Sequence, residues 1–281
     1  MVISGSDSTI LEQEVMIRLG FFGLIFVVMA LVEWSAPRRE RKVGKGKRWF
    51  NNIGILMIGN VLIRGAIPLL PVTVAVTASE NGWGILNLFA LPFLLEIILT
   101  ILILDLIIFF QHILFHRSGI LWRFHRMHHT DLDLDVTSAL RFHPVEMIIS
   151  LGIKISAVIM LGLPPLGVLI FEVILNGMAM FNHANARIPL RADASLRKFI
   201  VTPDMHRVHH SVILSENRSN FGFNLSIWDH IFHTYIDQPV QGHTSMKIGI
   251  NDFRDPSSMT LPWLLTMPFK RSIASSSQSK S

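Results

Sequence analysis

Apolar stretches long enough to cross a membrane recur along the chain, separated by short polar segments. Residues 15–32 are apolar except for Arg18, and a helix of this length spans roughly 27 Å, close to the thickness of a bilayer core. Residues 53–77 form a second apolar stretch, interrupted by Pro68 and Pro71. The pattern predicts a transmembrane helix in each stretch.

Three further apolar stretches follow. Residues 85–110 are the most apolar part of the chain, and Pro144 begins another helix that we expect to end at Leu161. The Gly-Leu-Pro-Pro sequence at 162–165 breaks that helix, and residues 166–181 run back as the second arm of a hairpin. We expect five spans, of which the second and the hairpin are also compatible with re-entrant segments. The predicted fold class is an all-α, multi-pass membrane helical bundle with a cytoplasmic His-rich helical cap.

Composition and charge support a membrane protein with a defined orientation. Half of the residues are hydrophobic, 16% are charged, and the mean hydropathy is +0.46. Seven of the basic residues lie within residues 37–48, directly after the first predicted span. Such a run marks the cytoplasmic flank of a membrane helix, and we set aside its alternative reading as a nucleic-acid-binding patch.

Histidines form the most informative motif. The pattern H-x-x-H-H occurs twice, at His125-His128-His129 and at His206-His209-His210, and His112 and His116 lie four residues apart at the end of the third apolar stretch. Histidines at helical spacing share a face, as ligands of one metal must. Counting spans from the basic segment places all eight, together with His183, at the cytoplasmic membrane face.

So many imidazoles exceed the four to six ligands of one ion, so the sequence predicts two metal ions. The alternative is a set of unrelated surface histidines near lipid headgroups. Cysteine is absent, which leaves only nitrogen and oxygen ligands. Imidazole suits several metals, and we favour iron because two adjacent redox-active ions suit activation of O2.

Acidic residues near the histidines are candidates to orient the imidazole rings. These candidates are Asp105, Asp131, Asp133, Asp135, Glu172 and Asp204. For residues 131–135 a solvated acidic loop is an equal alternative, and Arg64 is the expected partner of the acids within the spans. Two further histidines, His143 and His233, are possible additional ligands, and His143 could instead cap the helix that begins at Pro144.

Several enzyme classes lack support in the sequence. There is no H-E-x-x-H motif of zinc proteases, no phosphate-binding loop and no glycine-rich dinucleotide motif. A redox reaction would therefore draw electrons from a separate donor protein. The remaining non-enzymatic alternative is a membrane metal-binding or transport protein, which would need a polar path across the bilayer.

The chain resembles the fatty acid hydroxylase/sterol desaturase family over about residues 85–235. The resemblance is carried by Asp105 with Gln111-His112 and Phe115-His116, and by WRFHRMHHTD (122–131), RFHPVE (141–146), FNHAN (181–185), TPDMHRVHHS (202–211), NFGFNLSIWD (220–229) and Thr234-Tyr235. One departure is His233, which stands where we expect a glycine.

The resemblance implies a multi-pass membrane oxidoreductase with two iron ions and O2 as co-substrate, which hydroxylates or desaturates a sterol, a fatty acyl chain or a related lipid. It implies that the nine histidines named above, His183 included, are the ligands, and that a cytochrome, ferredoxin or reductase supplies electrons. The expected organisation is a flexible N-terminus (1–14), N-terminal transmembrane helices with the basic segment (15–84), the catalytic domain (85–245), and an interfacial segment with a flexible tail (246–281). Oligomeric state remains open.

Overall fold

The computed structural model describes residues 5–67, 70–256 and 259–271, and side chains from Gln13 onward. The predicted break at Pro68 and the serine-rich tail lie outside these residues. The helices are α1 (Gly5–Ser35), α2 (Lys45–Ala66), α3 (Pro71–Glu80), η1 (Ile85–Leu88), α4 (Phe93–Arg117), α5 (Gly119–His129), η2 (Ser138–Leu140), α6 (Pro144–Leu161), α7 (Pro165–His183), α8 (Leu190–Leu196), α9 (Pro203–His209), α10 (Leu214–Asn217), α11 (Ile227–Ile231), α12 (Leu261–Thr266) and η3 (Met267–Phe269).

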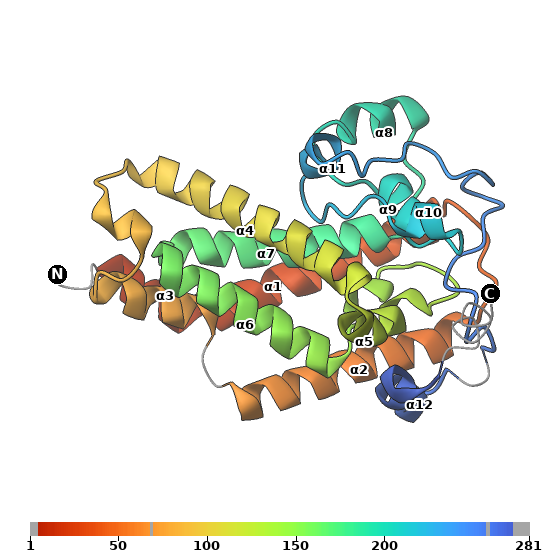
Figure 1. Cartoon of the computed structure of the whole chain (residues 1–281), viewed down its shortest axis with the longest axis horizontal. Helices are drawn as coiled ribbons and strands as arrows, with labels where there is room; N and C mark the ends of the chain where they lie inside the picture. The colour runs from red at the N-terminus through yellow and green to blue at the C-terminus, as the bar shows by residue number, and fades with distance from the viewer. Residues whose placement is uncertain (1–4, 68–69, 257–258, 272–281) are drawn as a thin grey trace.

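Five helical segments are long and apolar enough to cross a membrane, which confirms the predicted number. They are Gln13–Ser35, Lys45–Leu88, Phe93–Arg117, Pro144–Leu161 and Pro165–His183. Figure 1 shows the long helices side by side along the length of the molecule, with the short helices α8 to α11 gathered at one end. The all-helical bundle with a separate helical region is therefore the predicted fold class.

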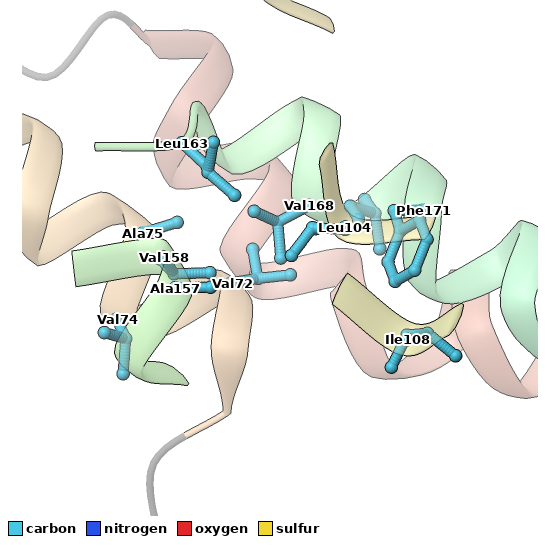
Figure 2. Close-up of a cluster of buried hydrophobic side chains, with 11 residues drawn as sticks. Val72, Val74, Ala75, Leu104, Ile108, Ala157, Val158, Leu163, Val168 and Phe171 are labelled. Atoms are coloured by element: carbon cyan, nitrogen blue, oxygen red, sulfur yellow. The ribbon is translucent and has the colours of Figure 1, made fainter. Parts of the chain in front are cut away.

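The apolar core lies between α3, α4, α6 and α7, toward the end of the bundle away from α9 (Figures 1 and 2). Leu104 of α4 and Phe171 of α7 are at most 1% exposed, and Val72 and Val158 pack in the same cluster. These apolar contacts fix the long helices against one another. Packing in this core thereby fixes the positions of the helix ends that carry the histidines.

The hairpin between α6 and α7 forms where the sequence predicts it. Gly162 ends α6 with φ of 68°, and its N–H donates to the carbonyl of Val158 at 2.9 Å. A Cβ atom there would lie 2.5 Å from the carbonyl oxygen of Trp83. Only glycine meets both the conformation and the close approach, so the hairpin and the segment before η1 pack tightly.

Helix α1 begins at Gly5. Two predicted features differ in the structure. Helix α4 begins at Phe93, after the short η1 and Pro92, whereas the predicted apolar stretch begins at residue 85. Arg64 is exposed on α2 and does not pair with Glu172, which instead binds Lys154 at 2.5 Å and Arg18 at 3.0 Å.

A buried arginine fixes the loop that follows the first H-x-x-H-H motif. Arg48 of α2 donates to Asp131 at 2.8 Å and to Asp135 at 2.6 Å, and Ser138 also accepts from it. Burial alone would raise the pKa of Asp131, but the positive charges of Arg48 and Arg141 outweigh it and hold that pKa at about 2. The acidic loop is therefore an internal anchor, not the solvated loop of the alternative reading.

Removing this arginine leaves two buried carboxylates unpaired. Arg48→Met is expected to lower the free energy of unfolding by about 3–5 kcal/mol, measured by thermal unfolding in detergent. The matched control is Arg64→Met on the same helix, which is exposed and should leave the melting temperature unchanged. Equal melting temperatures for the two variants would contradict the anchoring role.

Candidate metal centre

The nine histidines predicted as ligands come together in two buried groups. The first group, cluster A, comprises His112, His116, His125, His129 and His209; the second, cluster B, comprises His128, His183, His206 and His210. Within each cluster, one ring nitrogen from every member lies within 4.8 Å of the others. All nine are at most 7% exposed, which excludes the alternative of scattered surface histidines.

Each H-x-x-H-H motif serves both clusters. On α5, His125 and His129 point to cluster A while His128 belongs to cluster B. The second motif reverses this assignment: its outer pair, His206 on α9 and His210 directly after α9, belongs to cluster B, and its middle histidine, His209, belongs to cluster A. Rings of the two clusters touch, with His129 stacked on His210 at 4.4 Å between centroids. The duplicated motif is thus the geometric requirement of two adjacent sites.

Hydrogen bonds at Nδ1 orient several of the rings. Nδ1 of His112 donates to the carbonyl of Phe221 at 2.8 Å, and Nδ1 of His209 donates to the carbonyl of Ser219 at 2.7 Å. Because a carbonyl only accepts, both rings carry their proton on Nδ1 and present an Nε2 lone pair. His183 is fixed in the same way by the carbonyl of its own helix, at 2.7 Å. This is the tautomer that binds a metal through Nε2.

A carboxylate orients one ring of cluster A. Nδ1 of His125 lies 2.6 Å from Oε1 of Glu146, and both side chains are at most 5% exposed. Glu146 stands in the first turn of α6, two residues after Pro144. The amide of Asn217 contacts His129 Nδ1 at 3.1 Å and the carbonyl of His209 at 3.0 Å. The sequence pointed to Glu146 only through the RFHPVE motif, and no pattern marked Asn217.

The spacing of the ring nitrogens suits coordination of a metal ion better than hydrogen bonding between the rings. In cluster B, consecutive Nε2 atoms lie 3.0 Å apart for His128 and His183, 3.1 Å for His183 and His206, and 3.2 Å for His206 and His210. Neutral imidazoles supply one proton each, so these three contacts cannot all be hydrogen bonds once His183 Nε2 is a lone pair. Nitrogen ligands about 2.1 Å from one ion lie about 3.0–3.4 Å apart, which matches the observed spacing.

In cluster A, Nε2 of His116 and of His209 are buried without a hydrogen-bond partner. An unpaired buried nitrogen costs free energy unless it binds something. The donor set in both clusters therefore fits metal ions held by imidazole nitrogen alone.

The acids expected to orient the rings hold the surrounding chain instead. Asp105 accepts from Trp228 Nε1 at 2.8 Å and from the backbone of residues 224 and 225, next to the segment whose Phe221 carbonyl binds His112. Asp204 pairs with Arg38 and Arg207. Within the described residues, none of Asp105, Asp131, Asp133, Asp135, Glu172 and Asp204 forms a hydrogen bond with a cluster histidine.

Neither additional candidate histidine belongs to a cluster. His143 caps α6, where its Nδ1 accepts from the N–H of Val145 at 3.2 Å, as the capping alternative predicts. His233 is exposed and has φ of 56°. That left-handed conformation favours glycine, which explains why glycine is expected at this position.

Burial keeps five of the cluster histidines outside the spans neutral. Loss of hydration, and after it repulsion among neighbouring imidazoles, lowers the pKa of His128, His129, His206 and His210 well below 6.5. Burial lowers the pKa of His209 to about 3, although its hydrogen bond to the Ser219 carbonyl opposes this shift. Neutral imidazoles are the form that binds metals.

The metal-free protein is expected to lose stability as the pH falls below 6.5. The unfolded chain takes up protons near that pH, whereas the folded clusters do not, so acid favours unfolding. For His209 alone the loss is about 2 kcal/mol at pH 5. Thermal unfolding of chelator-treated protein from pH 8 to pH 5 tests this, and a flat profile would contradict neutral, buried clusters. His233→Gly, which removes an exposed imidazole, should show the wild-type profile.

Comparison with known proteins agrees with this geometry. The model of the fatty acid hydroxylase family matches residues 97–234, which include all nine cluster histidines. The ornithine lipid hydroxylase OlsE of Rhizobium tropici is 27% identical over 248 residues, covering 82% of this chain and 72% of OlsE. No solved structure matches the chain. The region similar to the fatty acid hydroxylase family, residues 97–234, therefore holds both histidine clusters.

Proposed function

We propose that this protein is a membrane-bound lipid hydroxylase that holds one iron ion in each histidine cluster and uses O2. The observation that carries the proposal is the burial of nine imidazoles in two touching groups, one of five and one of four. A structural zinc needs only four ligands, and two adjacent sites suit a reaction on O2.

The bound ions would supply the redox chemistry: one atom of O2 enters a C–H bond, and the other leaves as water with two electrons and two protons from a donor. The chain's own residues fix the rings. The Nδ1 bonds to carbonyl oxygens hold His112, His183 and His209 in the ligating tautomer. The carboxylate of Glu146 holds His125 and makes its ring a stronger donor.

Aromatic side chains cover the clusters. The ring of Phe221 lies 5.2 Å from that of His116 and 5.6 Å from that of His209, and Phe142 stacks on His128 at 4.6 Å. Phe221 is 2% exposed. Such walls keep water away from the reacting atoms, which protects a strong oxidant from side reactions.

The substrate that we propose is a polar membrane lipid that reaches the clusters from the bilayer. Support comes from the five apolar spans and from the relative OlsE, whose name describes hydroxylation of ornithine lipid. Sterols and free fatty acyl chains are the other candidates. Desaturation needs the same ligand arrangement, and a lipid product distinguishes it from hydroxylation.

We place the clusters on the cytoplasmic side, where a separate protein delivers electrons. The basic segment 37–48 is bound to the histidine end of the molecule: Arg38 pairs with Asp204 next to His206, and Arg48 pairs with Asp131 next to His129. A basic segment beside a span favours the cytoplasmic side. The sequence lacks a nicotinamide or flavin motif, which favours a separate donor, and the family resemblance suggests a cytochrome, a ferredoxin or a reductase for this role.

A transport function is less well supported. It requires polar groups in a continuous path through the bilayer, whereas the nine histidines gather in two adjacent groups. Mass spectrometry of total lipids from cells with and without the gene separates these functions. A gained oxygen supports hydroxylation and two lost hydrogens support desaturation; unchanged lipids in cells that supply the electron donor would contradict both.

Removing one ligand from either cluster should abolish the lipid product. His209→Ala tests cluster A and His128→Ala tests cluster B, and each purified variant should lose bound iron from its own cluster. The matched control is His233→Gly, which removes an exposed imidazole at a position whose backbone favours glycine. It should keep wild-type iron content and activity, and full activity in either cluster variant would refute the assigned site.

Glu146→Gln keeps a hydrogen-bond acceptor at His125 but removes the negative charge. We expect iron affinity and product formation to fall about 10–100-fold, with the melting temperature little changed. Glu146→Ala should be more severe, because Nδ1 of His125 would then be buried without a partner. Equal iron affinity in wild-type protein and both variants would show that Glu146 does not support the ligand.

A further inference from the structure

Helix α11 packs against the middle of a membrane-spanning helix. Nε1 of Trp228 donates to Asp105 at 2.8 Å, and the ring of Phe232 lies 5.4 Å from Phe109 and 4.9 Å from Phe110. Asp105 is 12 residues from either end of α4, or about 18 Å along the helix. Since α4 is about 37 Å long and a bilayer core is about 30 Å thick, this contact falls within the depth that the bilayer occupies.

The outer face of this region is apolar and exposed. Ile227, Ile231 and Phe232 at α11 are 41–52% exposed, and Leu190, Leu196 and Phe199 at α8 are 39–71% exposed. We call these six residues the α8–α11 surface. Its two parts form one unit, because the N–H of Ser226 donates to the carbonyl of Phe199 at 3.2 Å and that of Val201 donates to Asn224 at 2.9 Å.

This surface continues the lipid-facing side of α4. Phe110 of α4 is 45% exposed and its ring contacts Phe232, so apolar side chains pass from the spanning helix to α11. Figure 1 shows α8 and α11 next to each other on the side of the molecule that α4 borders. An exposed apolar face that adjoins a membrane-facing helix is the arrangement of an interfacial anchor.

The charges around α8 suit anionic lipid headgroups. Arg187, Arg191 and Lys198 are exposed, whereas the acid of α8, Asp193, is buried and paired with Arg197. Basic residues beside an apolar face bind the phosphates of an anionic leaflet.

We propose that the α8–α11 surface is seated in the bilayer leaflet on the side of the histidine clusters. The basic residues then lie among lipid headgroups, and the six apolar side chains lie among acyl chains. This position would hold the rim of the metal centre within the leaflet, so that a lipid substrate could reach it without leaving the bilayer. The anchor does not depend on iron or on the reaction.

The absence of cysteine allows a direct test with single spin labels. Phe199→Cys and Ile231→Cys each place a nitroxide on the α8–α11 surface. Two exposed positions serve as references: Val28→Cys on α1 for a label in lipid, and Ser215→Cys on α10 for a label in water. The full chain is reconstituted in bilayers of phosphatidylcholine with phosphatidylglycerol. Collision rates with O2, which concentrates in lipid, and with a water-soluble nickel chelate are then compared.

Labels at residues 199 and 231 should behave like the label at residue 28, with frequent O2 collisions and few nickel collisions. Behaviour like that of residue 215 would overturn the proposal, and so would shielding from both reagents, which indicates a covering protein or a second copy. Arg191→Glu with Lys198→Glu should raise nickel access at residue 199 in anionic bilayers but not in pure phosphatidylcholine. If the double variant shows the same nickel access at residue 199 in anionic bilayers as in pure phosphatidylcholine, headgroup binding is refuted. Unchanged melting temperatures verify that each variant is folded.

Discussion

The crossed use of the two H-x-x-H-H motifs is the constraint on which the rest of the structure depends. Each motif gives its outer pair to one cluster and its middle histidine to the other, so neither cluster can form unless α5 and α9 are placed correctly against each other. The four adjacent Nε2 atoms of cluster B cannot all pair by hydrogen bonds, because His183 offers a single lone pair to two neighbours, and this makes the metal-free centre unfavourable. Metal binding and the docking of the short helices are therefore one equilibrium.

Charged side chains around the two clusters fix the chain segments that take part in this docking. Asp229 accepts from the N–H of Phe221, whose carbonyl orients His112, and Asp105 holds the segment that follows Phe221. Arg48 holds the loop that follows His129. These carboxylates act on the centre through the backbone and not through the imidazoles. Two spanning helices, α4 and α7, thus deliver three of the histidines, while buried ion pairs fix the chain segments that carry or orient the other six.

The fold and the nine-histidine set followed from local patterns in the sequence. Apolar length predicts the spans, and Pro144 and Gly162 mark ends of a helix that the structure keeps. Local patterns do not show which residues that are distant in the sequence lie close together in space. Glu172 pairs with Lys154 and Arg18 on neighbouring helices, and Asn217 reaches His129 from the end of α10, a four-residue helix too short to show periodicity. The division of the histidines between clusters likewise depends on how α9 faces α5, which spacing along one helix does not encode.

The central claim is that imidazole nitrogens alone hold two metal ions in adjacent buried clusters. X-ray absorption at the iron edge of the purified protein, combined with its iron content, tests this claim most directly. The account predicts two iron ions per chain, with a first shell dominated by nitrogen and the multiple scattering of imidazole rings. One ion per chain, or a first shell dominated by carboxylate oxygen, would contradict it.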